Sequence, residues 1–241
     1  MTEVLELRQY TLHPGQRDVL IELFDREFVE SQEALGMRLY GQFRDLDDPD
    51  RFVWFRGFPD METRATALAA FYGGPVWAEH KEVANATMVT FDDVLLLRPA
   101  APDCGFDLAG RTRAPAGADV EDAEVSLVTV TLYHLPPDGD DFAEFFLTEV
   151  RPLLVETGAP PLACLRTETA ENNYPALPVR ADANVFAWVA AYPDQEAHLE
   201  HVRTLGRSAR WTHELLPLLT KYLARPPEQL HLAPTDRSLL R

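Results

Sequence analysis

The sequence predicts an α+β protein that contains two copies of one β-α-β-β-α-β unit, because two motifs match, the tryptophans pair and the order of elements repeats. Residues 52–60 read FVWFRGFPD and residues 186–194 read FAWVAAYPD, at an offset of 134 residues. All four tryptophans form pairs at that same offset: Trp54 with Trp188 and Trp77 with Trp211. Similarity at a fixed spacing is the signature of an internal repeat, so we expect two related halves.

An insertion is predicted in the second copy. Nearer the start of each copy the matched residues are 122 positions apart: Pro14 and Pro136, Phe24 and Phe146, Gly36 and Gly158. The offset therefore grows by twelve residues before the second motif is reached. Residues 172–182 are rich in Asn, Pro and Ala and have no helical or strand period, which places the insertion there.

The elements of the first copy follow from local patterns. Residues 4–12 alternate in polarity as a strand does, and Pro14 ends that strand. A helix is predicted over residues 17–35 from apolar residues at helical spacing, with Gly36 as its stop. The remaining predictions are strands at 37–45, 52–58 and 94–98, a helix at 60–71 capped by Asp60, and a helix at 76–86.

The second copy repeats this order of elements. Its predicted strands are residues 125–134, 163–168, 185–191 and 229–232, and its predicted helices are residues 141–156, 196–205 and 210–223. The chain thus divides into a first repeat at residues 1–99, a linker at 100–123 and a divergent second repeat at 124–241. Each unit forms a ferredoxin-like sheet with helices on one face only, so its other face needs a cover. We expect the two sheets to pack face to face as one barrel with a small-molecule pocket inside.

The first repeat resembles NIPSNAP-like domains. Its residues 6–15, ELRQYTLHPG, are similar to the E-x-R-x-Y-x-L-x-P-G opening of that family, and FVWF at 52–55 and the segment from Arg64 to Trp77 agree with it. The resemblance covers residues 3–99 and implies an intramolecular dimeric α+β barrel. That fold group includes cofactor-free antibiotic-biosynthesis monooxygenases, isomerases, polyketide cyclases and haem-binding chlorite-dismutase-like proteins. The resemblance does not imply one reaction.

Three polar side chains of the first strand are the candidate catalytic residues. Strand alternation places Leu5 and Leu7 on one face and Glu6, Arg8 and Tyr10 on the other. We expect the apolar pair to pack on the helices, which turns the polar row toward the barrel interior. Arg8 would then stabilise an oxyanion while Tyr10 or Glu6 moves a proton. The structural alternative is a Glu6–Arg8 ion pair that closes the barrel end, with Tyr10 bonded to the backbone.

The matching wall of the second repeat is predicted to be apolar. At an offset of 122 residues, the counterparts of the polar row are Val128, Val130 and Leu132. A pocket with one polar and one apolar wall suits an amphipathic organic molecule. We therefore expect a small hydrophobic molecule as the partner of an internal pseudo-dimer, with a further homo-oligomer left open.

Six more residues are candidates for substrate binding. They lie on strand faces that could reach the interior, or at a strand end: Trp54, Arg56, Arg38, Tyr40, Trp188 and His134. Aromatic side chains can stack on a planar ligand, and His134 would lie at the mouth of the pocket. The alternative for the aromatic residues is an ordinary core, and for the histidine a structural role.

Composition and missing motifs argue against several classes of protein. A formal net charge of −17 with no cluster of Lys or Arg disfavours nucleic acid and anionic membranes as partners. The start does not resemble a signal peptide and no apolar run approaches ~20 residues, so we expect a cytoplasmic protein.

No cofactor is expected, since dinucleotide, P-loop and serine-hydrolase motifs are missing. No metal is expected, because His198 and His201 lack a third ligand. Haem stays an alternative, with His80, His134 or His213 as its axial ligand.

Two functions remain open at this point. The first is a small-molecule enzyme of bacterial specialised metabolism, a cofactor-free monooxygenase, isomerase or cyclase for a hydrophobic, aromatic or polyketide-like substrate. The second is a non-catalytic ligand-binding or interaction protein of the NIPSNAP type. A filled barrel in which Glu6 and Arg8 are fully paired would favour the second.

Overall fold

The computed structural model describes residues 3–117, 126–137, 139 and 141–241. Val125, at the start of a predicted strand, and residues 118–123 of the predicted linker lie outside the described residues. No helix in the described ranges is long and apolar enough to cross a membrane.

The strands of both repeats close into one barrel. Those of the first repeat are β1 (Val4–Leu12), β2 (Arg38–Asp45), β3 (Arg51–Phe58) and β4 (Met88–Pro99). Those of the second are β5 (Leu127–His134), β6 (Ala163–Thr167), β7 (Val185–Tyr192) and β8 (Glu228–Pro234). The barrel order is β1-β3-β2-β8-β5-β7-β6-β4, so each repeat has the same internal order and the repeats join through the β2–β8 and β4–β6 pairs. The predicted tandem α+β barrel is confirmed.

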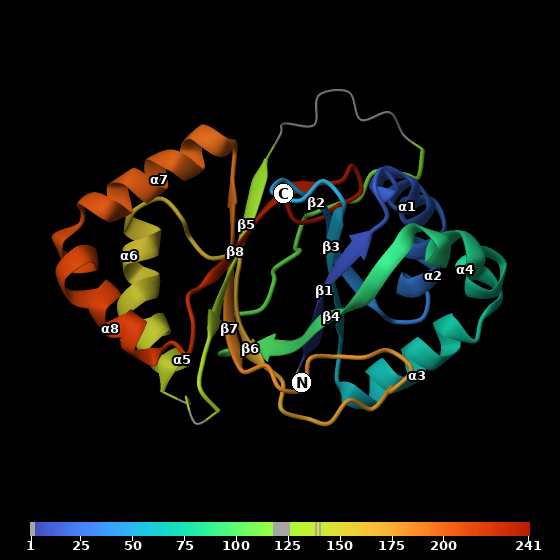
Figure 1. Ribbon diagram of the computed structural model, residues 1–241, viewed down its shortest axis with the longest axis horizontal. Coiled ribbons are helices and arrows are strands. Elements are labelled where there is room, and N and C mark those ends of the chain that lie inside the picture. Colours follow the sequence, from blue (N-terminus) through green and yellow to red (C-terminus); the bar gives the residue numbers. More distant parts are fainter. Residues whose placement is uncertain (1–2, 118–125, 138, 140) are drawn as a thin grey trace.

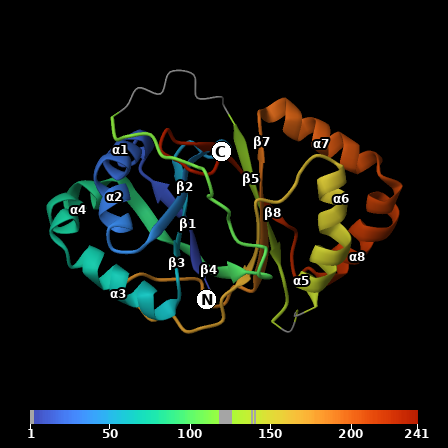
Figure 2. The same cartoon turned by 180° about the vertical axis from the view of Figure 1, so that it is seen from behind.

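The helices cover the outside of the barrel, one set for each repeat (Figure 1 and, from behind, Figure 2). The first repeat has α1 (Arg17–Leu23), a π-helical segment (Phe24–Phe28), α2 (Val29–Glu33), α3 (Met61–Tyr72) and α4 (Pro75–Thr87). The second has α5 (Phe142–Phe145), a π-helical segment (Phe146–Val150), α6 (Arg151–Glu156), α7 (Gln195–Arg207), a π-helical segment (Trp211–Leu215) and α8 (Leu216–Tyr222). The π-helical segments that start at Phe24 and Phe146 keep the predicted offset of 122 residues.

Short-range sequence patterns predict the start of α3 correctly and the start of β4 wrongly. The Asp60 carboxylate accepts a hydrogen bond from the backbone N–H of Thr63 at 2.7 Å, which is the N-cap that the sequence predicts. The last strand of the first repeat is longer than predicted and begins at Met88 rather than at residue 94. Its first half is largely exposed, so it carries no apolar alternation that would reveal it.

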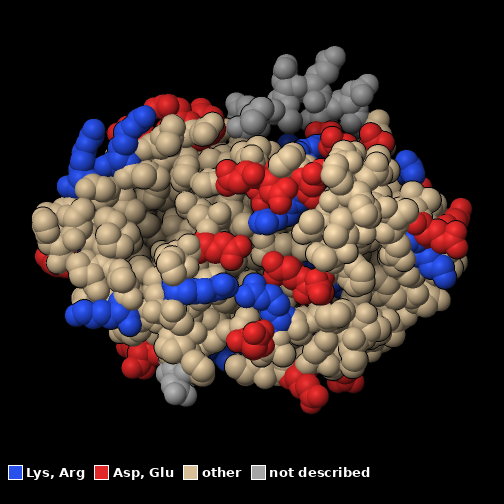
Figure 3. Space-filling view, viewed as in Figure 1, with Lys and Arg blue, Asp and Glu red and all other residues tan. Residues whose placement is uncertain are grey.

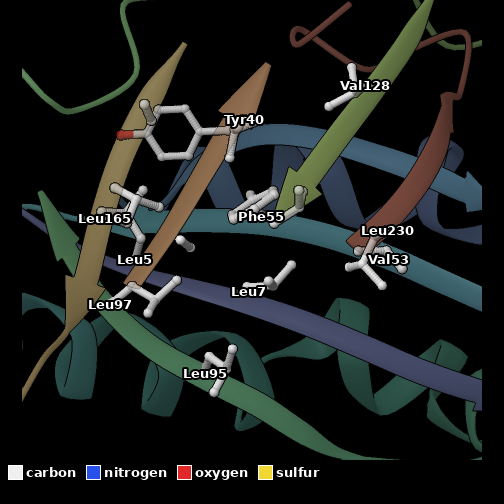
Figure 4. Close-up of a cluster of buried hydrophobic side chains, with 14 of the residues drawn as sticks. Leu5, Leu7, Tyr40, Val53, Phe55, Leu95, Leu97, Val128, Leu165 and Leu230 are labelled. Atoms are coloured by element: carbon white, nitrogen blue, oxygen red, sulfur yellow. The ribbon is translucent and has the colours of Figure 1, made fainter. Parts of the chain in front are cut away.

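The barrel interior is a packed apolar core. Side chains from both repeats meet there, and Figure 4 shows ten of them labelled: Leu5, Leu7, Tyr40, Val53, Phe55, Leu95, Leu97, Val128, Leu165 and Leu230. Leu5 and Leu7 therefore point inward, and Glu6, Arg8 and Tyr10 point outward, under the helices of the first repeat. The prediction that the polar row faces the interior, and with it the predicted pocket inside the barrel, is wrong.

The cause is a strand that is buried on both faces. Eight of the nine residues of β1 are buried, so alternation separates two faces without saying which of them meets the helices. Leu5 and Leu7 face the barrel interior, because aliphatic side chains can fill a closed barrel without leaving polar groups unpaired.

The offset between the first strands is 123 residues, one more than predicted. Val4 pairs with Phe58 in the first repeat and Leu127 pairs with Tyr192 in the second. Since Phe58 and Tyr192 correspond, Val4 corresponds to Leu127. A one-residue slip moves every side chain of a strand to its opposite face. The counterparts of Glu6, Arg8 and Tyr10 are therefore Thr129, Thr131 and Tyr133, and not Val128, Val130 and Leu132.

Leu7→Ala is expected to lower the free energy of unfolding by about 2–5 kcal/mol, since it opens a cavity in the packed barrel. Thr11→Ala, at an exposed position of the same strand, is expected to change it by no more than about 0.5 kcal/mol. Urea denaturation of both variants measures the difference. Equal effects would show that Leu7 does not face the core.

Candidate functional site

Four charged side chains, Glu6, Arg8, Arg56 and Arg64, lie buried between the sheet and the helices of the first repeat; we name them the Glu6 cluster. Glu6 Oε2 accepts hydrogen bonds from Arg8 Nη1 at 2.8 Å and from Arg56 Nε at 2.7 Å. Glu6 Oε1 accepts one from Arg64 Nε at 2.7 Å. None of the four side chains is exposed to solvent. Strands β1 and β3 and helix α3 thus meet at one carboxylate.

The electrostatics of the cluster fix Glu6 as an anion. Burial alone would raise the pKa of Glu6, but the guanidinium groups of Arg56, Arg8 and Arg64 outweigh burial and hold that pKa well below its usual range. Burial likewise lowers the pKa of Arg8, and its contacts with Tyr10 and Glu6 more than reverse that effect. With both oxygens bonded to arginines, Glu6 is placed to hold the cluster together rather than to carry a proton.

Tyr10 connects the Glu6 cluster to the space under the helices. Its hydroxyl oxygen accepts a hydrogen bond from Arg8 Nε at 2.9 Å, so its own O–H remains free to donate. Burial raises the pKa of Tyr10, although Arg8 opposes the shift, and the phenol is therefore protonated at neutral pH. A phenol polarised by a guanidinium is a strong hydrogen-bond donor toward a carbonyl or an enolate oxygen.

An aromatic pocket lies beside Tyr10 on the helix side of the sheet, with a volume of about 270 Å³. Its lining comes from β1, α3, α4 and β4 of the first repeat and from a loop of the second: Tyr10, Tyr72, Trp77, Asn85, Met88, Phe91, Tyr174, Ala176 and Leu177. A smaller inner cavity of about 30 Å³ continues from it toward Gln32 and Trp54. The two spaces share Tyr10, Tyr72, Trp77 and Met88. Apolar walls with few polar groups are typical of ligand sites.

The insertion of the second repeat, residues 172–182, closes this pocket; we name it the strap. Asn172 Oδ1 and Asn173 Oδ1 accept hydrogen bonds from Arg64 Nη1 at 3.0 and 2.9 Å. Tyr174 stacks on Tyr72 with ring centroids 6.2 Å apart. Figure 1 shows this segment, in orange, reaching from the second repeat to the side of α3. Arg64 thus bonds the strap with one end of its guanidinium and the Glu6 cluster with the other.

The structure brings together only some of the predicted binding residues. Trp54 lines the inner cavity, and the Arg56 guanidinium lies 5.0 Å from the Trp54 ring. Tyr40 lies in the barrel interior, where its hydroxyl is bonded to Glu3. Arg38 is exposed beside a different hollow. These last two do not reach the aromatic pocket.

Two other predicted binding residues belong to the second repeat and lie far from this pocket. Trp188 packs under the second set of helices. His134 lies at the end of β5, within 3.0 Å of Arg225 and 3.5 Å of Glu228. The second repeat has Ala190 where the first has Arg56, because Glu6 pairs with Arg56 and Thr129 with Ala190. The Glu6 cluster therefore has no charged counterpart at these positions.

Sequence reasoning missed Arg64, Gln32 and the strap. Arg64 shares a helix face with Ala67, Leu68 and Phe71, all buried. A single arginine on an apolar helix face indicates that the arginine is buried against a charged partner, so the sequence pattern could have identified it. Nothing local signals that Gln32 accepts a hydrogen bond from Arg56 at 3.0 Å.

The surface offers a contrast to the buried cluster. Over the barrel, acidic and basic side chains lie beside one another (Figure 3). A hollow of about 820 Å³ near the end of β4 has the same mixed character, with Glu3, Asp103, Arg98 and Arg166 in its lining. In the described ranges, no three His, Cys, Asp or Glu side chains gather as a metal site would need.

Comparison with known proteins agrees with this fold. Residues 5–102 match the NIPSNAP family model. None of the curated proteins matches the sequence.

Solved structures extend the similarity over the whole chain. A proposed monooxygenase from Fusobacterium nucleatum has a TM-score of 0.61 at 12% identity, covering 97% of this chain and 92% of that one. A proposed monooxygenase from Lactobacillus acidophilus has a TM-score of 0.59 at 13% identity, with 98% and 95% covered. An anthrone oxidase-like protein has a TM-score of 0.58 at 14% identity, with 97% and 91% covered. At such identities the similarity establishes the fold alone. Residues 5–102 of this chain therefore match the NIPSNAP family model, and the whole chain has the fold of an intramolecular dimeric α+β barrel.

Proposed function

We propose that this protein is an enzyme that oxidises a planar aromatic or polyketide-like molecule without a redox cofactor, in the aromatic pocket of the first repeat. The observation that carries the proposal is the Tyr10 hydroxyl, which is held by Arg8 at 2.9 Å and lines that pocket. Trp77, Tyr72 and Tyr174 supply aromatic walls for a flat ligand. The names of structural relatives, two proposed monooxygenases and one anthrone oxidase-like protein, support the same class of reaction.

The chemistry needs a substrate that can form an enolate. The Tyr10 O–H donates to the carbonyl oxygen of the ligand and stabilises the negative charge that appears there when a C–H group conjugated with that carbonyl loses its proton to water. The carbanion carbon forms a bond to dioxygen, and the resulting peroxide takes up a proton. Loss of water from that carbon then leaves a second carbonyl group. For anthrone the balance is one anthrone and one dioxygen to one anthraquinone and one water.

Tyr10→Phe is expected to lower kcat with anthrone by about 10²-fold or more, as removal of one oxyanion donor does. Tyr133→Phe is the matched control, because Tyr133 is the buried counterpart of Tyr10 in the second repeat. Anthraquinone absorbance and oxygen uptake measure the rate, and the unfolding midpoint checks that both variants fold. Equal rates for Tyr10→Phe and the wild type would remove Tyr10 from the mechanism.

The second candidate function is a ligand-binding protein without catalysis. The packed barrel interior and the complete pairing of Glu6 are the observations that favour it. Such a protein would bind anthrone-sized molecules, with affinity lost in pocket variants, and would show no oxygen uptake.

A further inference from the structure

The Glu6 cluster is not electrically balanced. It holds three guanidinium groups and one carboxylate, and Glu6 is the only carboxylate within 4.0 Å of those arginines among the described residues. The net charge of the cluster is therefore +2, in a region with no solvent exposure. Charge buried without a partner is strongly unfavourable, because the low-dielectric interior replaces the hydration of the ions only in part.

Besides Arg64 Nη2, which lies 2.7 Å from Glu6 Oε1, three buried donors near this charge lack a hydrogen-bond partner among the described residues: Arg8 Nη2, Arg56 Nη2 and Trp54 Nε1. They lie around one ring, since the guanidinium carbons of Arg8 and Arg56 are 5.6 and 5.0 Å from the Trp54 ring. All three are donors and none can accept. A water molecule could satisfy some of these hydrogen bonds but would bring no charge, whereas an anion supplies both acceptors and charge.

Among the residues with unpaired donors, Trp54 lines the inner cavity, whereas Arg8 and Arg56 lie behind its wall. Tyr10 lines the same cavity and accepts from Arg8, and Gln32 lines it and accepts from Arg56. Its volume of about 30 Å³ suits a group of two or three atoms and is small for a phosphate. It opens into the aromatic pocket through the shared residues Tyr72 and Trp77.

We propose that the molecule bound in the aromatic pocket is an aromatic carboxylate, whose carboxylate occupies the inner cavity and neutralises the arginines of the Glu6 cluster. A carboxylate there would accept a hydrogen bond from Trp54 Nε1, and its charge would lie next to the guanidinium groups that Tyr10 and Gln32 separate from the cavity. The inference rests on the proposed function for the location of the ligand, and it adds the charge and chemical class of that ligand. The aromatic body lies against Tyr72, Trp77 and Tyr174 while its acidic group points toward Trp54.

Calorimetric titration with 2-naphthoate, 2-naphthamide and 2-naphthol tests the proposal at pH 7. Naphthoate carries the charge, naphthamide has nearly the same shape without charge, and naphthol presents a neutral hydroxyl. We expect naphthoate to bind the wild type at least about tenfold more tightly than either neutral compound, as a charge-assisted hydrogen bond predicts. In Arg56→Gln the preference for naphthoate over naphthamide should fall below about threefold, and in Arg56→Lys it should persist in part.

The outcomes separate the inference from the function on which it rests. Equal affinity of the wild type for naphthoate and naphthamide would overturn the inference and leave the proposed function standing. Tighter binding of naphthol than of naphthoate would do the same and would assign the site to a hydroxyl. Failure of all three compounds to bind at millimolar concentration would overturn both. If Arg56→Gln does not fold, the wild-type comparison still decides.

Discussion

Glu6→Gln is expected to lower the free energy of unfolding by about 3–5 kcal/mol, a large part of the 5–15 kcal/mol of a typical domain. The substitution keeps the size of the side chain but leaves Arg8, Arg56 and Arg64 with no carboxylate within 4.0 Å among the described residues. The net charge of the cluster rises from +2 to +3 at a site without solvent exposure. Urea denaturation at pH 7 measures the loss.

Thr129→Val is the matched control, since Thr129 occupies the same barrel position in the second repeat and is also buried. It removes a hydroxyl and no charge, so we expect a change below about 1 kcal/mol in the free energy of unfolding.

The dependence of the unfolding free energy on pH provides an independent check. The folded-state pKa of Glu6 lies below its ordinary value of 4.5, so its stabilising contribution is present above that pH and is lost as the pH falls below it. Glu6→Gln should lack this part of the acid dependence. A loss under about 1 kcal/mol in Glu6→Gln would mean that the arginines are not held by this carboxylate.

The repeat and the barrel could be predicted because local sequence patterns determine the elements of each repeat and recur in the second copy. The Asp60 cap acts over three residues, and a duplicated unit leaves the same pattern twice, which the two tryptophan pairs reveal. Two sheets with one bare face each have few ways to cover those faces, so the closed barrel follows from the repeat.

The orientation of β1 could not be predicted from alternation alone. One face carries Leu5 and Leu7 and the other Glu6, Arg8 and Tyr10, and both faces are buried. Tyr10 of the polar row lines a pocket, but that pocket lies under the helices and not within the barrel. Which face of β1 points into the barrel depends on the side chains of the opposite sheet, and these lie far away in the sequence.

The strap was predicted as an insertion, and its role was not. Asn172 and Asn173 meet Arg64 across 108 and 109 residues of sequence, and no local pattern encodes such a contact. The contact gives a physical reason for the fusion of the two repeats. A pocket of the first repeat that needs a wall from the second gains from having that wall on the same chain, where its effective concentration is high.

The double variant Asn172→Ala, Asn173→Ala is expected to release the strap. Both side chains accept hydrogen bonds from Arg64 Nη1, and each hydrogen bond to a charged group contributes about 1.5–3 kcal/mol. An unpaired buried guanidinium is costly, so the strap should leave α3 and let water reach Arg64. A loss of about 3 kcal/mol in the opening free energy corresponds to an open population roughly 100-fold larger. Tryptic cleavage after Arg180, the only Lys or Arg within residues 172–182, should accelerate by a similar factor when opening is faster than cleavage.

Asn184→Ala is the control for this release. Asn184 lies just beyond the strap and donates to the Pro136 carbonyl at 2.7 Å, without touching Arg64, so cleavage after Arg180 should stay at the wild-type rate. Because Tyr174, Ala176 and Leu177 line the pocket, the double variant should also bind 2-naphthoate at least about tenfold more weakly, and naphthoate should protect wild-type Arg180 from trypsin. Unchanged cleavage in the double variant would show that Leu177, buried in the core of the first repeat, and the Arg180–Asp93 pair at 3.2 Å suffice to hold the strap. The strap would then be a fixed wall of the pocket, and Arg64 would serve the Glu6 cluster alone.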